Sequence, residues 1–408
     1  MKARVSIAHS MFTTFSRRPP AGRSVVTALL PIVTAVFTAY LVIGLAMPVL
    51  PLHVHQGLGL GTFVVGLVAG SQFAASLISR FWAGHHADSR GAKRTVVTGL
   101  VVAGMAGLLY LLSLRFVSNP ETSVTILLVG RALLGGAESF IIAGAFIWGL
   151  ALVGTQNTGQ VMAWVGIPMY IAFAIGAPAG NALYAGYGFA AIAVATMLVP
   201  LATLLLVTPL RAVAPTPNVR PSFVKVIGAV WMPGVGLALS SVGFGAITTF
   251  IALLFAGRGW GPAWPAFTSV SIAFVMGRLI FGHLPDRIGG AKVALVCVLI
   301  EAAGQALIWS APGPPLVLLG AALTGFGYSL VYPAFGVEAV RRAPPESRGL
   351  ATGAYTAFLD LALGLANPAL GLIASAAGLA SVFLVSTLVL LFAAAVAMRL
   401  LYARSHAA

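Results

Sequence analysis

The sequence predicts an all-α integral membrane protein with twelve transmembrane helices, arranged as two pseudo-symmetric bundles of six. Composition is the first reason: 59% of the 408 residues are hydrophobic and only 8% carry a charge, whereas soluble domains carry about 25%. So few charges cannot cover a water-facing surface of this size, so most of the chain must face lipid. A series of long apolar segments and an internal repeat are the second and third reasons.

Twelve apolar segments are each close to the length of about 20 residues that a helix needs to cross a bilayer. Six in the first half of the chain cover approximately residues 27–51, 61–83, 95–115, 123–149, 160–184 and 188–208. Six in the second half cover approximately residues 227–256, 262–283, 293–311, 315–339, 350–373 and 378–402. Many contain glycine or proline, which neighbouring helices accommodate in membranes, so we expect kinks that can move.

These segments divide the chain into four parts. We expect a tail at 1–24, a first bundle at 25–208, a cytoplasmic linker at 209–225 and a second bundle at 226–408. The tail is basic but lacks an apolar core ahead of a cleavage site. It is therefore interpreted as a disordered cytoplasmic tail and not as a cleavable signal peptide.

Positive charge is distributed unevenly between the two ends of the predicted bundles. An even number of spans puts both termini on one side, and 20 of the 23 lysines and arginines fall on that side. Only Arg115 and Arg258 fall on the other side, and Arg131 lies inside a span. The positive-inside rule therefore makes both termini cytoplasmic. Because the basic residues flank apolar segments, the net charge of +15 does not predict a nucleic-acid partner.

The two halves of the chain repeat each other. Residues 84–94 read GHHADSRGAKR and residues 282–292 read GHLPDRIGGAK, so Gly, His, Asp and Gly recur at an offset of 198. An arginine stands four residues before each of these stretches. Further along, Gly188 matches Gly378 at an offset of 190. A duplicated six-helix unit explains this pattern and predicts the pseudo-symmetry.

These stretches resemble the major facilitator superfamily over the whole chain after the tail. The loop that begins at Gly84 resembles the signature of that superfamily between helices 2 and 3. Residues 130–137, GRALLGGA, resemble its buried-arginine motif in helix 4, and residues 175–180, IGAPAG, resemble its antiporter motif in helix 5. The resemblance implies the major facilitator fold.

Within the superfamily, residues 325–332, 344–349 and 358–361 most resemble the YhhS/YfcJ-type, arabinose-efflux-permease-like bacterial transporters. The resemblance implies a secondary transporter in the bacterial inner (cytoplasmic) membrane, whose two halves give a small solute access to each side in turn. It also implies a monomer whose partners are a small-molecule substrate and the lipid bilayer. No cofactor is expected, and since no ATP-binding P-loop occurs in the sequence, the expected energy source is a proton gradient.

Charged residues inside the spans are candidates for proton coupling, because a charge at the bilayer centre costs about 2.5–3.5 kcal/mol on insertion scales. Arg131 and Glu138 are seven residues apart on the predicted fourth helix, so they share a face about 10 Å apart along the axis. The motif implies that this face looks into a central cavity, where Glu138 would exchange a proton and Arg131 or bound substrate would bias its pKa. The alternative is a static polar cluster that fixes helix packing.

Asp360 is the third candidate for proton coupling. It lies eleven residues into the predicted eleventh helix, about 16 Å along the axis and near the bilayer centre. No basic residue lies within a turn or two, so Asp360 must find a partner on another helix or be protonated. We expect a site for a proton or a cationic substrate. The alternative is a hydrogen bond to a Ser or Tyr of a neighbouring helix.

Two further carboxyl groups are given other roles. Glu301 is in the middle of the predicted ninth helix, which the resemblance places at the periphery, and it is interpreted as a structural carboxyl that is protonated or locally paired. Glu338 stands just before Arg341 and Arg342, so we expect it in a charge network at the membrane interface.

The two repeated loops are expected to gate the inner side. By the resemblance, Asp88 would bind the start of helix 11 near Arg348, and Asp286 the start of helix 5 near Gly159, because exposed N–H groups there favour a carboxylate. The alternative is an ordinary solvated turn. The predicted gating residues are Gly84, Asp88, Arg90, Gly91, Gly282, Asp286, Arg287, Gly289 and Arg348.

The substrate cavity is expected between helices 1, 2, 4 and 5 and their partners in the second half. Its predicted contacts are Tyr40, Gln72, Tyr170, Asn181, Tyr328, Tyr355 and Asn367. For each of them, packing between membrane helices is the alternative role. Gly66 and Gly70 form a GxxxG step, which we interpret as a close helix contact that can slide.

No metal site is predicted. Histidines occur in two pairs, His53 with His55 and His85 with His86, but no nearby carboxylate or cysteine completes a ligand set. The single cysteine, Cys297, excludes a disulfide framework. No nucleophile–base or metal constellation is apparent, so the chain is not expected to be an enzyme.

Proton-coupled efflux of a sugar, drug or metabolite is the function that the sequence favours. An inward proton gradient drives export if protonation and substrate binding compete, and the membrane potential adds about 2.3 kcal/mol per charge per 100 mV. Two alternatives stay open, namely a proton-coupled importer of a sugar or organic solute and a non-transporting membrane receptor. A channel would need a continuous selectivity filter, of which the sequence gives no sign.

Overall fold

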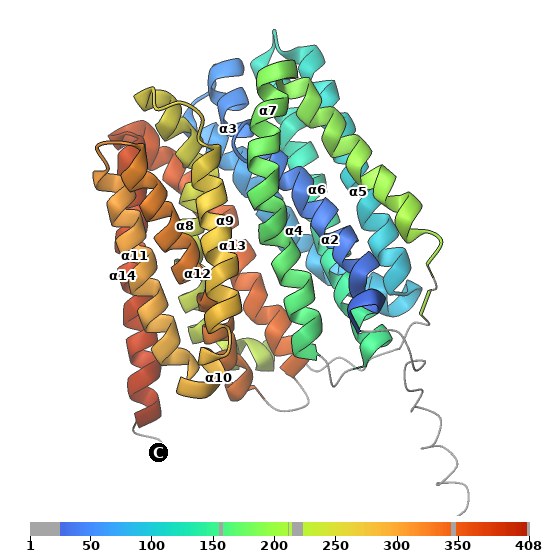
Figure 1. Cartoon of the computed structure of the whole chain (residues 1–408), viewed down its shortest axis with the longest axis vertical. Coiled ribbons are helices and arrows are strands. Elements are labelled where there is room, and N and C mark those ends of the chain that lie inside the picture. The colour runs from blue at the N-terminus through green and yellow to red at the C-terminus, as the bar shows by residue number, and fades with distance from the viewer. Residues whose placement is uncertain (1–24, 155–157, 211, 214–222, 344–347, 406–408) are drawn as a thin grey trace, which may run out of the picture.

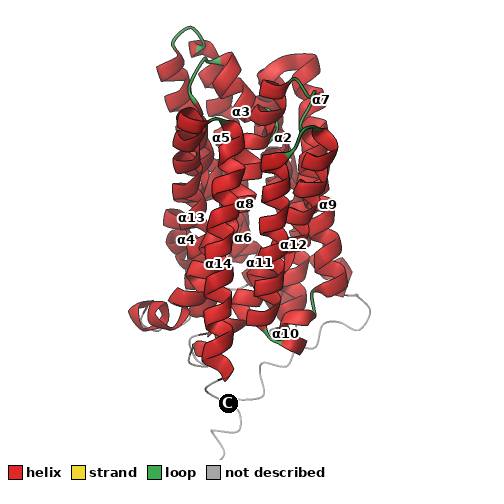
Figure 2. Ribbon diagram, turned by 90° about the vertical axis from the view of Figure 1, so that its left-hand side faces the viewer, coloured by secondary structure: helices red, strands yellow, loops and turns green. Residues whose placement is uncertain are grey.

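The computed structural model describes residues 25–154, 158–210, 212–213, 223–343 and 348–405, and these are almost entirely helical (Figure 2). Eleven of the helices are long and apolar enough to cross a membrane. One of the eleven, α7, contains two predicted spans. The predicted all-helical membrane fold is thereby confirmed. The predicted tail and most of the predicted linker lie outside the described residues.

The helices of the first half follow the predicted order. They are α2 (Val25–Ala46), α3 (Leu50–Leu52) with the π-helix His53–Gly57, α4 (Thr62–Arg90), α5 (Ala92–Ser113) with the 3₁₀ turn Leu114–Phe116, α6 (Pro120–Val153) and α7 (Thr158–Val207). Gly188 interrupts α7 with φ of +69°, a conformation that costs glycine little. This break separates the fifth and sixth predicted spans.

The second half continues in the same way. Its helices are α8 (Phe223–Arg258), α9 (Trp264–Phe281), α10 (Leu284–Ile288), α11 (Gly290–Ser310), α12 (Pro314–Arg342), α13 (Arg348–Ala377) and α14 (Leu379–Ser405). The two halves lie side by side, with α2 and α4–α7 on the right of Figure 1 and α8–α14 on the left. The end of the molecule at which α2 begins and α14 finishes is called the terminal end below, and the opposite end is called the far end.

The first repeated loop is shorter than predicted. We expected a loop from Gly84 to Arg94, but α4 continues to Arg90 and only Gly91 separates it from α5. In the second half, α9 ends at Phe281 and a separate short helix follows. The difference is explained by one repeat position, which is Ala87 in the first half and Pro285 in the second. Proline lacks the N–H that would continue the helix and fits best in a first turn, which is where α10 holds it.

The turn that follows is the same in both halves. Gly91 has φ of +94° and Gly289 has φ of +97°, in a region that disfavours residues with a side chain. These two glycines match each other at the repeat offset of 198. The repeat therefore encodes a shared backbone turn as well as a shared sequence.

Candidate functional site

A hydrogen-bonded carboxylate lies where the first-half helices converge. Glu138 on α6 accepts a hydrogen bond from the Tyr40 hydroxyl of α2 at 2.7 Å and from Gln72 Nε2 of α4 at 2.8 Å. One turn of helix further, Ser76 of α4 and Ser139 of α6 share a hydrogen bond of 2.9 Å. Three predicted site residues, Tyr40, Gln72 and Glu138, are therefore in direct contact.

An ion pair joins the two halves next to this carboxylate. Arg80 of α4 binds Asp360 of α13, with 2.9 Å between Nε and Oδ2 and a second contact from Nη2. The Asp360 side chain is 5% exposed and that of Arg80 is 28% exposed. Arg80 also lies close enough to Glu138 for their charges to interact. The central cluster, meaning Tyr40, Gln72, Arg80, Glu138 and Asp360, thus holds two carboxyl groups and one guanidinium.

Sequence reasoning missed Arg80 as a member of the site. We counted it among the charges that orient the helices, yet it falls within the predicted span 61–83. That position was the available signal, because an arginine inside a span needs an anionic or polar partner. Its repeat counterpart, Arg278 of α9, donates instead to the backbone carbonyl of Ser329 at 2.7 Å.

Arg131 lies apart from the central cluster, contrary to the expectation that it acts on Glu138. Its guanidinium lies beside the Tyr110 hydroxyl of α5, and the Tyr110 ring packs where Gly130 leaves room. Residues seven apart share a helix face, but they are about 10 Å apart along the axis. Each of them can therefore contact a different neighbouring helix. The charge that Glu138 meets is therefore that of Arg80.

Aromatic rings fill the centre of the interface between the halves. Tyr170 of α7 stacks on Phe274 of α9, with 3.3 Å between ring centroids and 13° between planes. Phe244 of α8 stacks on Tyr328 of α12 at 5.3 Å and also faces Phe173 of α7. These rings come from both halves, so separating the halves would expose them.

The other three predicted cavity residues have different surroundings. The Tyr355 hydroxyl donates to the Tyr332 carbonyl at 2.8 Å, which is a packing role. Asn367 is fully buried, and its side-chain nitrogen and oxygen have no hydrogen-bond partner among the described atoms. Asn181 is half-buried on α7, and no hydrogen bond or ring contact described for the chain connects it to the central cluster.

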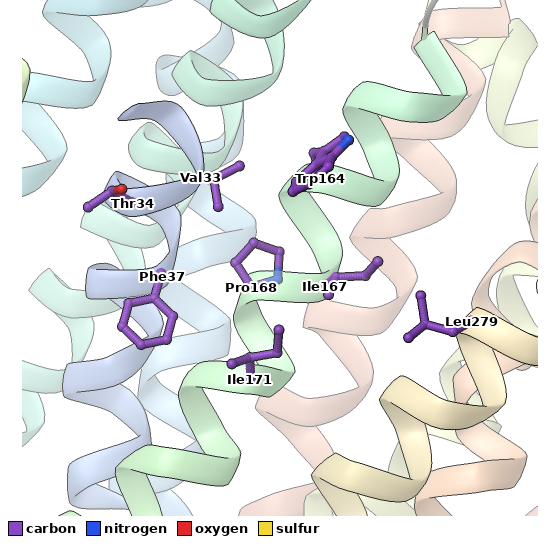
Figure 3. Close-up of a pocket in the computed structure, with 8 residues that line it drawn as sticks. All are labelled: Val33, Thr34, Phe37, Trp164, Ile167, Pro168, Ile171 and Leu279. Atoms are coloured by element: carbon purple, nitrogen blue, oxygen red, sulfur yellow. The ribbon is translucent and has the colours of Figure 1, made fainter. Parts of the chain in front are cut away.

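A cavity of about 670 Å³ lies between α2 and α7 of the first half and α9 of the second half (Figure 3). Side chains of α2, α7 and α9 line it, and nearly all are apolar. They are Val33, Thr34, Phe37, Trp164, Ile167, Pro168, Ile171 and Leu279. The volume suits a small organic molecule.

The far end is closed by close packing of α4 on α13. The Thr62 hydroxyl donates to the Gly371 carbonyl at 2.8 Å. A Cβ at Gly66 would collide with the backbone of Asn367, and one at Gly70 would come within 2.8 Å of the Gly364 carbonyl oxygen. The GxxxG step is therefore a contact between the two halves.

Replacing Gly66 with alanine is expected to open the far end, because the added methyl group has no room against the α13 backbone. Electron–electron distances between spin labels on the far ends of α4 and α13, in a Cys297→Ser background, would measure the opening. Gly186→Ala is the matched control, since a Cβ there meets nothing within 4 Å. Equal distance distributions in the two variants would contradict the prediction.

The predicted gating residues lie at the terminal end. Gly84, Asp88 and Arg90 belong to the last two turns of α4, Gly282 follows α9, and Asp286 and Arg287 are exposed on α10. Gly91 and Gly289 form the turns described above. The side chains around Arg348 and Gly159, the expected partners of the two aspartates, lie outside the described residues. The gating contacts therefore stay a prediction.

Glu338 has the local network that we expected. It forms an ion pair of 3.0 Å with Arg342 on α12, and it accepts a hydrogen bond from the backbone N–H of Ala291 at the start of α11. His53 is buried and stacks on Phe189 at 4.1 Å, while His55 bonds the Leu60 carbonyl. Within the described ranges, no three His, Cys, Asp or Glu side chains converge on one point.

Comparison with known proteins identifies what this architecture resembles. The family model described as Major Facilitator Superfamily matches residues 32–269 and 259–408. A protein of Salmonella typhimurium named an uncharacterised MFS-type transporter is 43% identical over 93% of this chain and 97% of its own length. A similarly named protein of Burkholderia pseudomallei is 43% identical over 90% of both chains.

Two solved structures share the arrangement of helices at low identity. A variant of the nucleoside transporter NupG matches with a TM-score of 0.73 at 14% identity, over 91% of this chain and 99% of its own. The human organic anion transporter MFSD10 matches with a TM-score of 0.68 at 14% identity, over 93% of this chain and the whole of its own. At such identity these matches support the fold alone.

Proposed function

Because this chain belongs to the Major Facilitator Superfamily, and is thus a membrane transporter and not an enzyme, we propose that it exports a small organic solute across the bacterial inner membrane in exchange for protons. Members of the family act on small molecules and need no cofactor. The observation that carries the proposal is the central cluster, in which Glu138 of the first half lies beside the Arg80–Asp360 pair that joins the two halves.

The distribution of charge supports the orientation of the molecule. Without Arg80, which pairs with Asp360 in the central cluster, 19 of the 23 lysines and arginines still fall by sequence on the side of the termini, and the positive-inside rule then makes the terminal end cytoplasmic. The closed far end then faces outward, and we propose that the cavity of Figure 3, whose lining residues lie toward the terminal end of α2, α7 and α9, is reached from the cytoplasm. This is the state in which an exporter collects its cargo.

The chemistry of the central cluster supports proton coupling. The two groups that donate hydrogen bonds to Glu138, the Tyr40 hydroxyl and the Gln72 amide, are neutral. They can therefore bind the Glu138 side chain both when it is ionised and when it is protonated. Asp360 is bound to an arginine that belongs to the other half. A proton or a cation that competes for Asp360 would weaken the contact between the halves, and one that competes for Glu138 would change the charge that Arg80 meets beside it. Competition of this kind converts a proton gradient into movement of the two halves.

The same cluster favours a cargo with positive charge and apolar surface. With both carboxyl groups ionised, one guanidinium leaves the cluster with one excess negative charge. Aromatic rings next to it, such as Tyr40 and Phe173, attract cations through their faces. We therefore propose an amphipathic organic cation as the preferred cargo, carried by a monomer of the YhhS/YfcJ-type group.

Everted membrane vesicles test this function. Vesicles that contain the protein are energised to acidify their interior, and a panel of organic cations, organic anions, sugars and nucleosides is added while a pH-sensitive dye is followed. An exporter in exchange for protons dissipates the gradient when its cargo is added, and an organic cation should give the largest response. A response only in right-side-out vesicles would indicate import, and none in either orientation would favour a receptor. Vesicles with Glu138→Gln serve as the control.

A further inference from the structure

A buried carboxyl group that the proposed mechanism does not use lies inside the second half. Glu301 of α11 is fully buried, and neither of its two side-chain oxygens has a hydrogen-bond partner among the described atoms. One turn further on the same helix, Gln305 is also fully buried, and its Oε1 is likewise without a partner. A buried acceptor without a donor carries a desolvation penalty, and an ionised acceptor carries a larger one.

The amide and hydroxyl donors described beside Glu301 and Gln305 are already used. Gln305 Nε2 donates to the Gly243 carbonyl of α8 at 3.2 Å and to the Thr324 hydroxyl of α12 at 3.1 Å. The Thr324 hydroxyl itself donates to the Gly320 carbonyl at 2.9 Å. Turning the Gln305 amide over would put its oxygen against the Gly243 carbonyl, which can only accept. The cluster therefore has three more acceptors than donors.

The surroundings of Glu301 offer no compensating charge. A Cβ at Gly243 would lie 2.7 Å from Glu301 Oε1 and 3.5 Å from Gln305 Cδ, so both side chains face the same point on α8. The titratable groups that act on Glu301 are neutral ones, namely Cys297 one turn earlier, Tyr328 of α12 and Tyr170 of α7. From α14 the neighbour is the apolar Leu390. No described Lys, Arg or His forms an ion pair with this carboxyl.

We propose that Glu301 and Gln305 form a proton-binding site inside the second half, separate from the central cluster. A proton on Glu301 removes the buried charge and supplies the missing donor, for which Gln305 Oε1 is the unpaired acceptor one helical turn away. The packed arrangement of α8, α11 and α12 therefore requires Glu301 to be protonated. Losing the proton leaves a bare carboxylate against α8, so release requires α8 to move or water to enter.

Helix α8 connects the Glu301–Gln305 site to the interface between the halves. Ser241, two residues before Gly243 on α8, shares a hydrogen bond of 3.1 Å with Tyr328, whose ring stacks on Phe244 in the centre. A movement of α8 that responds to the proton on Glu301 would therefore also move this aromatic wall. Protonation of Glu301 would thereby be coupled to the aromatic rings that we expect a cargo to contact.

Infrared spectroscopy of the purified protein in lipid nanodiscs at neutral pH tests the site without substrate or gradient, so its outcome is independent of the proposed function. The wild type minus Glu301→Gln difference should contain the carbonyl band of one protonated carboxylic acid per chain. Glu338→Gln is the matched control, because Glu338 is ion-paired with Arg342, and it should lose a carboxylate band instead. Gln305→Leu, which removes the acceptor but keeps the acid, should shift the frequency of the Glu301 band.

Three results would overturn the proposal. Loss of a carboxylate band in Glu301→Gln would mean that Glu301 is ionised. An unshifted band in Gln305→Leu would mean that Gln305 does not accept the proton, and this variant also keeps the test decisive if Glu301→Gln does not fold. Loss of the band when sodium chloride is added at constant pH, but not when choline chloride is added, would mean that the site takes an alkali cation.

Discussion

Replacing Arg80 with alanine is expected to destabilise the protein and to abolish transport. The change leaves Asp360 as a buried carboxylate without its partner, and breaking a buried pair from one side costs about 3–5 kcal/mol. Because the Arg80 side chain is 28% exposed, the cost should fall at the lower end of this range. Thermal unfolding in detergent and uptake by proteoliposomes would measure the two effects.

Two further variants separate the pair from a general effect of losing an arginine. Arg278→Ala removes the repeat counterpart, which bonds only a backbone carbonyl in the contacts described above, so it should cost less. The double variant Arg80→Ala, Asp360→Ala removes both charges and should recover most of the stability while transport stays absent. A double variant no more stable than Arg80→Ala would show that the two side chains do not form a pair.

Replacing Glu138 with glutamine is expected to uncouple transport from protons. Glutamine keeps the size of the side chain and still accepts from Tyr40 or Gln72, but it cannot exchange a proton. Accumulation against a gradient should fall at least tenfold (about 1.4 kcal/mol), whereas exchange of labelled for unlabelled cargo across the membrane should persist. The cargo would be the compound found with everted vesicles.

The control for this variant lies on the same helix. Glu121 is an exposed carboxylate in the first turn of α6, and Glu121→Gln should leave accumulation unchanged. If Glu138→Gln retained full proton-driven accumulation, Glu138 would not be the coupling residue. Asp360 would then be the remaining carboxyl group of the central cluster.

The sequence was sufficient for the fold because the fold depends on long apolar segments and on a repeat, both of which are local patterns. It was less informative about where helices stop. The stretch after Gly84 looked like a loop because it is polar, but polar residues at a membrane surface can extend a helix into water. In the second half the helix is interrupted because of Pro285 and not because the stretch is polar.

The site was predicted only in part, because its contacts join residues far apart in the chain. Tyr40, Gln72 and Glu138 were candidates by residue type, and the structure brings them into contact. Arg80 was overlooked because its partner is 280 residues away. The phenylalanines of the centre, such as Phe244 and Phe274, could not have been singled out, since phenylalanine is ordinary in any membrane helix.

The close packing of α4 on α13 has a consequence for how the far end is controlled. The contacts at Gly66, Gly70 and Gly371 are made by backbone atoms, the Pro368 ring and one hydroxyl, with no charged side chain among them. Dissolved ions screen charges, and they have little effect on a van der Waals contact. The seal should therefore hold equally well at low and high ionic strength. We therefore expect opening of the far end to depend on the Arg80–Asp360 pair. Arg80 lies about three to five turns further along the same α4 helix, toward the terminal end.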